Sequence, residues 1–252
     1  MCLYFRVGSA DLHLHTLASD GLMATRTLLD HVEHTTTLDL IAITDHDELA
    51  ASLEAREWAT RHGYRVQVVP GVEVTTRDGH LLALFLEERP PALKPLLATA
   101  EWVLAHGGLC IAPHPFTRWT HSLNMRAMLD GMRRGLLAGI EVFNSSPAGR
   151  ASQPRALQFA DQHGLACLGG SDAHMLNIVN LVRTRFPGNT PADLRHAIER
   201  ASTSAEGRFA TPREIAVEAL PQLARSMLHL PARRVLRYAR TRHLGRSTEA
   251  LR

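Results

Sequence analysis

Lysine is almost absent from this chain of 252 residues, in which Lys94 is the only one. It lies between prolines in Pro90-Pro91-Ala92-Leu93-Lys94-Pro95, a segment that we interpret as a connection. Schiff-base chemistry needs a lysine amine and a P-loop needs Gly-Lys-Ser/Thr. The sequence therefore disfavours both functions.

Cysteine and long apolar runs are scarce as well. Cys2, Cys110 and Cys167 have no metal-binding spacing and an odd count, which predicts neither a zinc ribbon nor a disulfide framework and favours a reducing, cytoplasmic setting. No run approaches the ~20 apolar residues of a membrane-spanning helix, so we expect no transmembrane segment. The formal net charge of +3 is too small to indicate a partner.

Short apolar runs alternate with longer helical patterns up to about residue 205, which is typical of βα units around a mostly parallel sheet. We therefore predict one α/β domain over residues 1–205. The seven predicted strands lie near Ala10–His15, Asp39–Thr44, Val66–Val74, His80–Leu86, Leu109–Pro113, Gly139–Asn144 and Ala166–Ser171. The predicted helices are Ala24–Thr36, Glu48–His62, Ala92–His106, Leu123–Arg134 and Arg150–His163.

Turn residues support this alternation. Gly63, Gly107, Gly135 and Gly164 follow predicted helices at the position of a C-terminal cap. The third and fourth strands are joined by a segment too short for a helix and containing Asp78-Gly79, so we predict a hairpin there.

Residues 206–252 have a different pattern, which predicts a C-terminal basic helical extension packed on or beside the first domain. Helical patterns cover Thr211–Met227 and Ala232–His243, and seven arginines occur from Arg225 to Arg246 before the next acidic residue, Glu249. The arginines either stay solvated on a packed helix or contact a membrane surface, a nucleic acid or another subunit.

Two histidines on the first strand are candidate metal ligands. In Asp11-Leu12-His13-Leu14-His15, the imidazoles of His13 and His15 share one face of the strand, and ring nitrogens ~5–7 Å apart can bind one divalent ion. Asp20 adds a carboxylate in the following loop, where Asp-Gly is otherwise a turn. Of the fifteen histidines, six fall in helical patterns and are assigned surface or core roles: His31, His34, His62, His106, His163 and His196.

Ligand-type residues also end most of the later strands. Asp45-His46-Asp47 follows the second strand, where one of the aspartates is expected to cap the next helix. Glu73 lies inside an apolar run, where a carboxylate costs several kcal/mol unless it is paired or metal-bound. The remaining ligand-type residues at strand ends are His80, His114, Asp172 and His174.

The chain resembles PHP (polymerase and histidinol phosphatase) domain proteins, a family of metal-dependent phosphoesterases. The four motifs of that family are matched in this chain by His13-x-His15, Thr44-Asp45-His46, Pro113-His114-Pro115 and Ser171-Asp172-Ala173-His174, with Gly71-x-Glu73 as a further match. The resemblance covers about residues 10 to 186. It implies a distorted seven-stranded (β/α)7 barrel of TIM-like type.

The resemblance also implies two or three divalent ions, which mixed nitrogen and oxygen ligands limit to Mn²⁺, Zn²⁺ or Fe²⁺. The first would be held by His13, His15, Glu73 and Asp172, and the second by Glu73, His80 and His114. The third would be held by Asp20, His46 and His174.

These ions would activate a water for hydrolysis of a phosphate mono- or diester, as in a nucleotide phosphatase or a 5′-3′ exonuclease. We expect Asp47 to orient the water or a substrate hydroxyl, and Arg118 and Asn144 to contact phosphate. Members of this family that hydrolyse nucleoside bisphosphates and short RNA have a sizeable helical insertion between the fourth strand and the Pro-His-Pro motif. Here only Glu87 to Leu109 separate the two, which leaves room for a single helix. The lid that would select a nucleotide is therefore missing or reduced, and we expect a broad or small phosphoester substrate.

Two other functions compete with this one. Gly169-Gly170-Ser171-Asp172-Ala173 loosely resembles a serine-hydrolase elbow, although it lacks the final glycine. A metal-stabilised barrel that binds a partner through the basic C-terminal helices, without turnover, is the non-enzymatic alternative. The sequence does not predict the oligomeric state.

Overall fold

Apolar runs that are buried along their whole length form the centre of the sheet. In the computed structural model, which describes residues 6–117, 120–216 and 219–229, every residue of Leu40–Ile43 is buried. Among the described residues there are nine strands: β1 (Val7–Leu14), β2 (Leu40–Ile43), β3 (Gln67–Thr76), β4 (Gly79–Leu84), β5 (Leu109–Ala112), β6 (Gly139–Asn144), β7 (Ala166–Gly170), β8 (Val182–Pro187) and β9 (Ser204–Gly207).

The strands are joined in the order β7-β6-β5-β4-β3-β2-β1-β8-β9. The pairs β1–β2, β2–β3, β5–β6 and β6–β7 are parallel, whereas β4 and β8 are antiparallel to their neighbours. The predicted hairpin of the third and fourth strands is confirmed, with Thr76 opposite Gly79.

The sheet is nearly closed, because β7 also contacts strands from its other end. The Thr184 hydroxyl of β8 accepts from Gly169 N and donates to Gly169 O, at 3.0 and 2.9 Å. Just after β7, Ala173 forms a parallel bridge with Leu14 of β1. The carboxyl ends of β1 and β7 therefore lie side by side.

The predicted seven-stranded barrel was wrong in its strand count. The alternating burial of β8 places Arg183 and Arg185 in half-exposed positions, so its sequence is not the continuous apolar run of an inner strand. The four residues of β9 have no buried side chain. The sequence prediction missed both strands because neither is a continuous apolar run. The TIM-like α/β character was predicted correctly.

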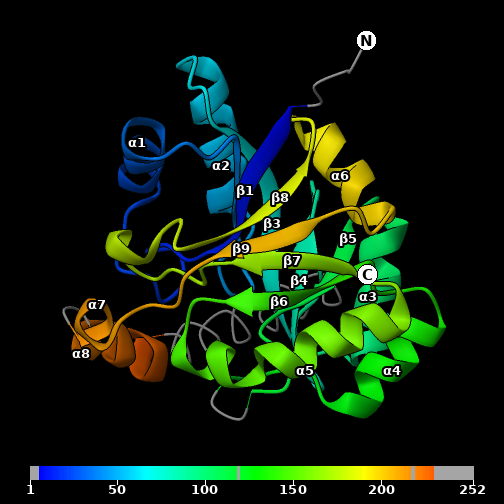
Figure 1. Cartoon of the computed structure of the whole chain (residues 1–252). Helices are drawn as coiled ribbons and strands as arrows, with labels where there is room; N and C mark the ends of the chain where they lie inside the picture. Colours follow the sequence, from blue (N-terminus) through cyan, green and yellow to red (C-terminus); the bar gives the residue numbers. More distant parts are fainter. Residues whose placement is uncertain (1–5, 118–119, 217–218, 230–252) are drawn as a thin grey trace, which may run out of the picture.

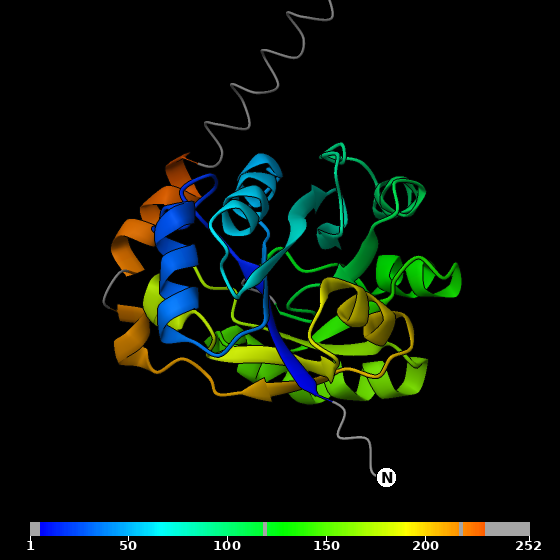
Figure 2. The ribbon, with the colours of Figure 1, turned by 90° about the horizontal axis from the view of Figure 1, so that it is seen from above.

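Helices cover the outside of the sheet (Figures 1 and 2). The first two lie on one side and the third to fifth on the opposite side (Figure 1). The helices are α1 (Thr25–Thr35), α2 (Ala50–Arg61), α3 (Leu96–Ala105), α4 (Met125–Arg133), α5 (Pro147–His163), α6 (Pro191–Glu199), α7 (Pro212–Ala216) and α8 (Ala219–Ala224), with shorter turns η1 (Leu176–Ile178) and η2 (Arg225–His229).

Local signals set the helix ends. Each of the four predicted C-terminal glycines has a positive φ, between +62° and +75°, which confirms the predicted caps. At the start of α5, the Ser146 hydroxyl accepts from Gly149 N, and Pro147 occupies the first turn. Helix α3 begins at Leu96, later than predicted, because Pro95 cannot donate within a helix.

The C-terminal region is described only in part. Over the predicted helix Thr211–Met227 the described residues form α7, α8 and η2, and residues 217–218 lie outside the described residues. The predicted helix Ala232–His243 and most of the arginines lie outside the described residues, and the domain boundary near residue 205 stays a prediction. None of the described helices is long and apolar enough to cross a membrane.

Candidate metal centre

The two histidines at the end of β1 lie on one face, as predicted. The rings of His13 and His15 are completely buried, and their centroids are 5.1 Å apart. Leu12 and Leu14, which alternate with them, pack into apolar clusters instead. The period-two alternation of a strand therefore separates ligands from core.

Glu73 is the centre of the site, because both of its carboxylate oxygens face imidazole nitrogens. Oε1 lies 2.8 Å from His80 Nδ1 and 3.0 Å from His114 Nε2. Oε2 lies 3.0 Å from His46 Nδ1. The side chain is only 1% exposed, so the burial cost that the sequence indicated is offset by these partners.

Asp172 brings a second carboxylate to the β1 histidines. Its Oδ1 lies 3.4 Å from His13 Nε2 and 3.3 Å from His15 Nε2. The same two nitrogens lie 3.5 and 3.4 Å from Glu73 Oε2. These four residues are the set that the family resemblance implies for the first ion.

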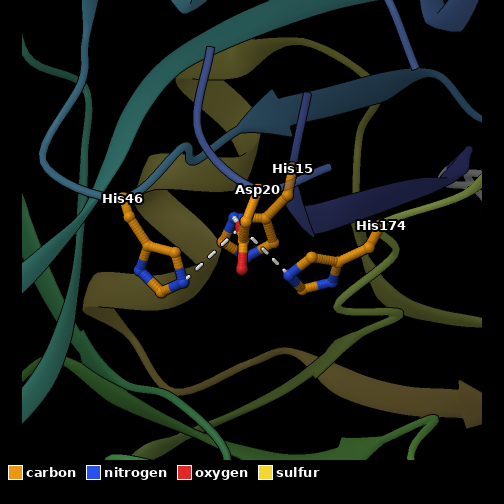
Figure 3. Close-up of side chains that lie close together, drawn as sticks. All are labelled: His15, Asp20, His46 and His174. Carbon is orange, nitrogen blue, oxygen red and sulfur yellow. Dashed lines mark ion pairs between the residues drawn. The ribbon is translucent and has the colours of Figure 1, made fainter. Parts of the chain in front are cut away.

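Asp20 is the centre of another group (Figure 3). Its Oδ1 lies 3.3 Å from His174 Nε2 and 3.8 Å from both His46 Nε2 and His15 Nδ1. Figure 3 shows the carboxylate between the His46 and His174 rings, with His15 behind it. This group contains the three residues implied for the third ion and adds His15 to them.

All nine predicted metal ligands lie in this centre. They form four overlapping groups whose ligand atoms are within 4.8 Å of one another: His15, Asp20, His46 and His174; His13, Glu73 and His114; His13, His15 and Asp172; and His46, Glu73 and His80.

The donor atoms fit divalent cations. His13 Nε2, both ring nitrogens of His15, His46 Nδ1 and His80 Nδ1 are buried without a hydrogen-bond partner. Buried polar atoms are normally hydrogen-bonded, and unpaired nitrogens converging on carboxylates are the donor set that Mn²⁺, Zn²⁺ or Fe²⁺ uses.

The electrostatics keep the carboxylates ionised. Burial alone would raise the pKa of Glu73, but the His80, His46 and His13 imidazoles outweigh it and hold that pKa well below its usual range. The pKa of Asp172 is lowered in the same way, chiefly by His13. Burial lowers the pKa of His46, which favours the neutral imidazole that binds metal.

Glu141 supports the centre and was not predicted. This buried carboxylate of β6 lies with Oε1 at 2.9 Å from His13 Nδ1, and its Oε2 accepts from His114 N at 2.7 Å. Glu141 therefore orients His13 through its ring nitrogen and His114 through its backbone N–H. The sequence signal that could have identified Glu141 is the one used for Glu73, a carboxylate within an apolar strand.

Asp45 supports the loop that contains Asp20. Its carboxylate accepts from Thr16 N at 2.7 Å, from the Thr16 hydroxyl at 2.6 Å and from the Ser19 hydroxyl at 2.5 Å. Of the two aspartates around His46, neither caps α2, whose N-cap residue is Leu49.

The three predicted catalytic residues have different surroundings. The Asp47 carboxylate accepts from Thr75 N at 2.7 Å and so ties the loop after β2 to β3. The Asn144 amide lies 3.3 Å from Asp172 Oδ2 and 3.4 Å from Glu141 Oε2, which places it beside the ligands. Arg118 lies outside the described residues.

Two ligands have strained backbones. His114 has a φ of 29° and Asp172 a φ of 54°, a region that residues other than glycine rarely adopt. Such conformations cost about 1–3 kcal/mol and persist where the surroundings fix them, as Glu141 does at His114 N.

The centre opens into a cavity of about 560 Å³. Seven of the nine predicted ligands line it: Asp20, His46, Glu73, His80, His114, Asp172 and His174. His13 and His15 lie behind them. A substrate in this cavity would meet the ligand cluster directly.

Comparisons with known proteins agree with this site. The family described as PHP-associated matches residues 152–203. The uncharacterised protein MJ1587 of Methanocaldococcus jannaschii is 35% identical over 149 residues, which cover 54% of this chain and 81% of that protein. The 5′-3′ exoribonuclease Rnm of Salmonella typhimurium is 40% identical over 92 residues, covering 35% of this chain and 31% of the exoribonuclease.

The fold comparison points the same way. A two-domain protein from Bacteroides vulgatus, described as containing a predicted PHP-like metal-dependent phosphoesterase, superposes with a TM-score of 0.69 at 20% identity, covering 88% of this chain and 70% of that one. The chain belongs to the PHP family, whose members are metal-dependent phosphoesterases.

Proposed function

We propose that this PHP-family hydrolase cleaves phosphate mono- or diesters with water activated at the centre around Glu73. The observation that supports this most is the arrangement at Glu73, whose two oxygens face imidazole nitrogens from β4 and from the segments that follow β2 and β5. One carboxylate between two sets of histidines is suited to bridging two cations. Two bridged cations are a common arrangement for phosphoester hydrolysis.

When bound, divalent ions in these groups would lower the pKa of a water and withdraw charge from the phosphate oxygens. The protein's own contribution is to fix the ligands. Glu141 holds His13 Nδ1 and the His114 backbone, and Asp45 holds the loop before Asp20. Such preorganisation spares the reaction the cost of rearranging ligands.

Roles for Asp47, Arg118 and Asn144 are part of the proposal. Asn144 lies close enough to Asp172 for its amide to orient that carboxylate or a phosphate oxygen. Asp47 is buried and bonded to Thr75 N, which supports a role in shaping the site beside His46.

For the substrate we propose a class of compounds and not a single compound. The match to the Salmonella exoribonuclease supports a nucleotide or the end of a short nucleic acid, but it spans less than a third of that protein. Between β4 and β5 the chain has a single helix, α3, as the spacing predicted. We therefore propose a small phosphorylated compound, a nucleotide included, as the substrate.

Hydrolysis of a panel tests the proposal. p-Nitrophenyl phosphate, its bis ester, nucleoside monophosphates, 3′,5′-bisphosphates and a short 5′-phosphorylated RNA would be assayed with and without Mn²⁺. We expect Mn²⁺-dependent turnover of at least one compound. Glu73→Gln should lower kcat/KM by roughly 10³-fold or more, because a neutral amide cannot hold two cations.

Glu54→Gln, an exposed glutamate of α2, is the matched control and should keep wild-type activity. Turnover that persists in Glu73→Gln, or that a chelator does not reduce, would contradict the proposal.

A further inference from the structure

The cavity over the metal centre has a second, apolar wall. Facing the ligands, it is lined by Met175, Ile178, Ala210, Ile215 and Leu223. Three of these side chains, those of Met175, Ile178 and Ala210, are buried in the apolar cluster behind the wall. Leu223 is 51% exposed. A large apolar side chain that is half exposed inside a catalytic cavity is available to contact a substrate.

Hydrogen bonds hold the wall against the metal centre. Ala210 N donates to Ser145 O at 2.9 Å, and the Ser145 hydroxyl donates to Ser171 O at 2.6 Å, next to Asp172. On the other side, the Asn177 amide of η1 donates to Glu214 O of α7 at 2.9 Å. The wall is thus tied to the strand ends that position the ligands.

The segment containing Leu223 is joined to the centre directly. The Ser226 hydroxyl donates to Asp20 Oδ2, the oxygen of this ligand that faces away from the His174 contact. The Arg225 guanidinium donates to Leu17 O and Ser19 O at 3.1 Å each, on the loop that leads to Asp20. In Figure 1 the arrows of β6 and β7 point toward the side where α7 and α8 lie.

We propose that this apolar wall is a subsite for the leaving group of the phosphoester, and that it selects esters with an apolar, flat leaving group such as an aryl ring. The inference rests on the proposed function. A phosphate bound at the ligands would direct its ester oxygen into the same cavity, where the apolar wall lies next to polar residues such as His121, Ser146 and Gln222. Contact of the leaving group with Leu223 and Ile215 removes apolar surface of the leaving group and of the wall from water.

The test compares phenyl and methyl phosphate, and the non-hydrolysable phenylphosphonate and methylphosphonate, on the metal-loaded protein. Wild-type protein should favour the phenyl compound in both kcat/KM and binding by calorimetry. Leu223→Asn, a neutral change of similar size, should reduce that preference by roughly tenfold and affect the methyl compounds much less, because only the phenyl ring reaches the wall.

Leu220→Asn is the matched control, since Leu220 lies on the same helix, is 80% exposed and does not line the cavity. It should keep the full phenyl preference. Equal binding of the two phosphonates by the wild type, or a preference that Leu223→Asn leaves intact, would overturn the subsite. If neither ester is hydrolysed but the phosphonate preference follows Leu223, the hydrolytic function fails and the subsite stands.

Discussion

Glu141 fixes two ligands without belonging to any of the four ligand groups. A glutamine in its place offers one acceptor oxygen where the carboxylate offers two, so it cannot serve both His13 Nδ1 and His114 N. We expect Glu141→Gln to weaken Mn²⁺ binding by roughly 10–100-fold. A metal titration of this variant beside Glu54→Gln would measure it, and equal affinities would show that Glu141 has no orienting role.

Metal binding should depend on pH through His174. Burial alone would lower the pKa of this imidazole, but Asp20 and Asp172 outweigh it and raise the pKa to about 9 in the metal-free protein. The ring is therefore protonated at pH 7, and an ion must displace that proton to bind. Mn²⁺ affinity should rise from pH 6 to pH 8 with net release of protons.

Calorimetry in two buffers of different ionisation enthalpy would count the released protons. His174→Asn should release fewer than the wild type. A pH-independent affinity with no proton release in either protein would refute the role of His174.

Residue types and spacing were enough to single out nine candidate ligands, all of which lie together in the centre, because most of them flank a strand or interrupt an apolar run. They were not enough to predict how the ligands divide into groups. His15 faces both Asp172 and Asp20, since its two ring nitrogens point in different directions. That depends on the ring orientation, which strand periodicity does not specify.

Gly170, the last residue of β7, lies where any side chain would disturb the contact between Glu141 and His13. A Cβ there would be 2.3 Å from Glu141 Oε1 and 2.8 Å from His13 Cβ. We expect Gly170→Ala to destabilise the protein by about 1–3 kcal/mol and to weaken metal binding, because Glu141 must move away from His13. Urea unfolding and a metal titration would measure the two effects.

Gly131→Ala is the matched control. Its Cβ would come no closer than 3.4 Å to Leu137, and its position inside α4 favours alanine by about 0.5–1 kcal/mol. This variant should be as stable as the wild type or more so. A Gly170→Ala protein that behaves like Gly131→Ala would mean that the β6–β7 contact does not constrain the site.

The inner elements were predictable because burial on both faces leaves a continuous apolar run, as in β2 and β5. The outer strands β8 and β9 present polar side chains and gave no such run. Within the predicted helix Thr211–Met227 the described residues form α7, α8 and η2, and residues 217–218, between α7 and α8, lie outside the described part of the chain. Leu223 of α8 and Ser226 of η2 line the cavity.

Closure of the sheet brings together residues of the centre that are far apart in the sequence. His13 and its supporting residue Glu141 are separated by 128 residues and meet because β1 adjoins β7, which pairs with β6. Converging carboxylates and unpaired imidazole nitrogens are costly in a buried centre unless cations are bound. The fold and the metal ions should therefore stabilise each other.

The most direct test is to count metal ions per chain and activity on the same samples. Protein loaded with Mn²⁺ would be stripped with a chelator and reloaded stepwise, with the metal measured by mass spectrometry and phosphoester hydrolysis assayed at each step. We predict two or three ions per chain at saturation and activity that disappears and returns with them. Hydrolysis that survives complete removal of metal would contradict this prediction.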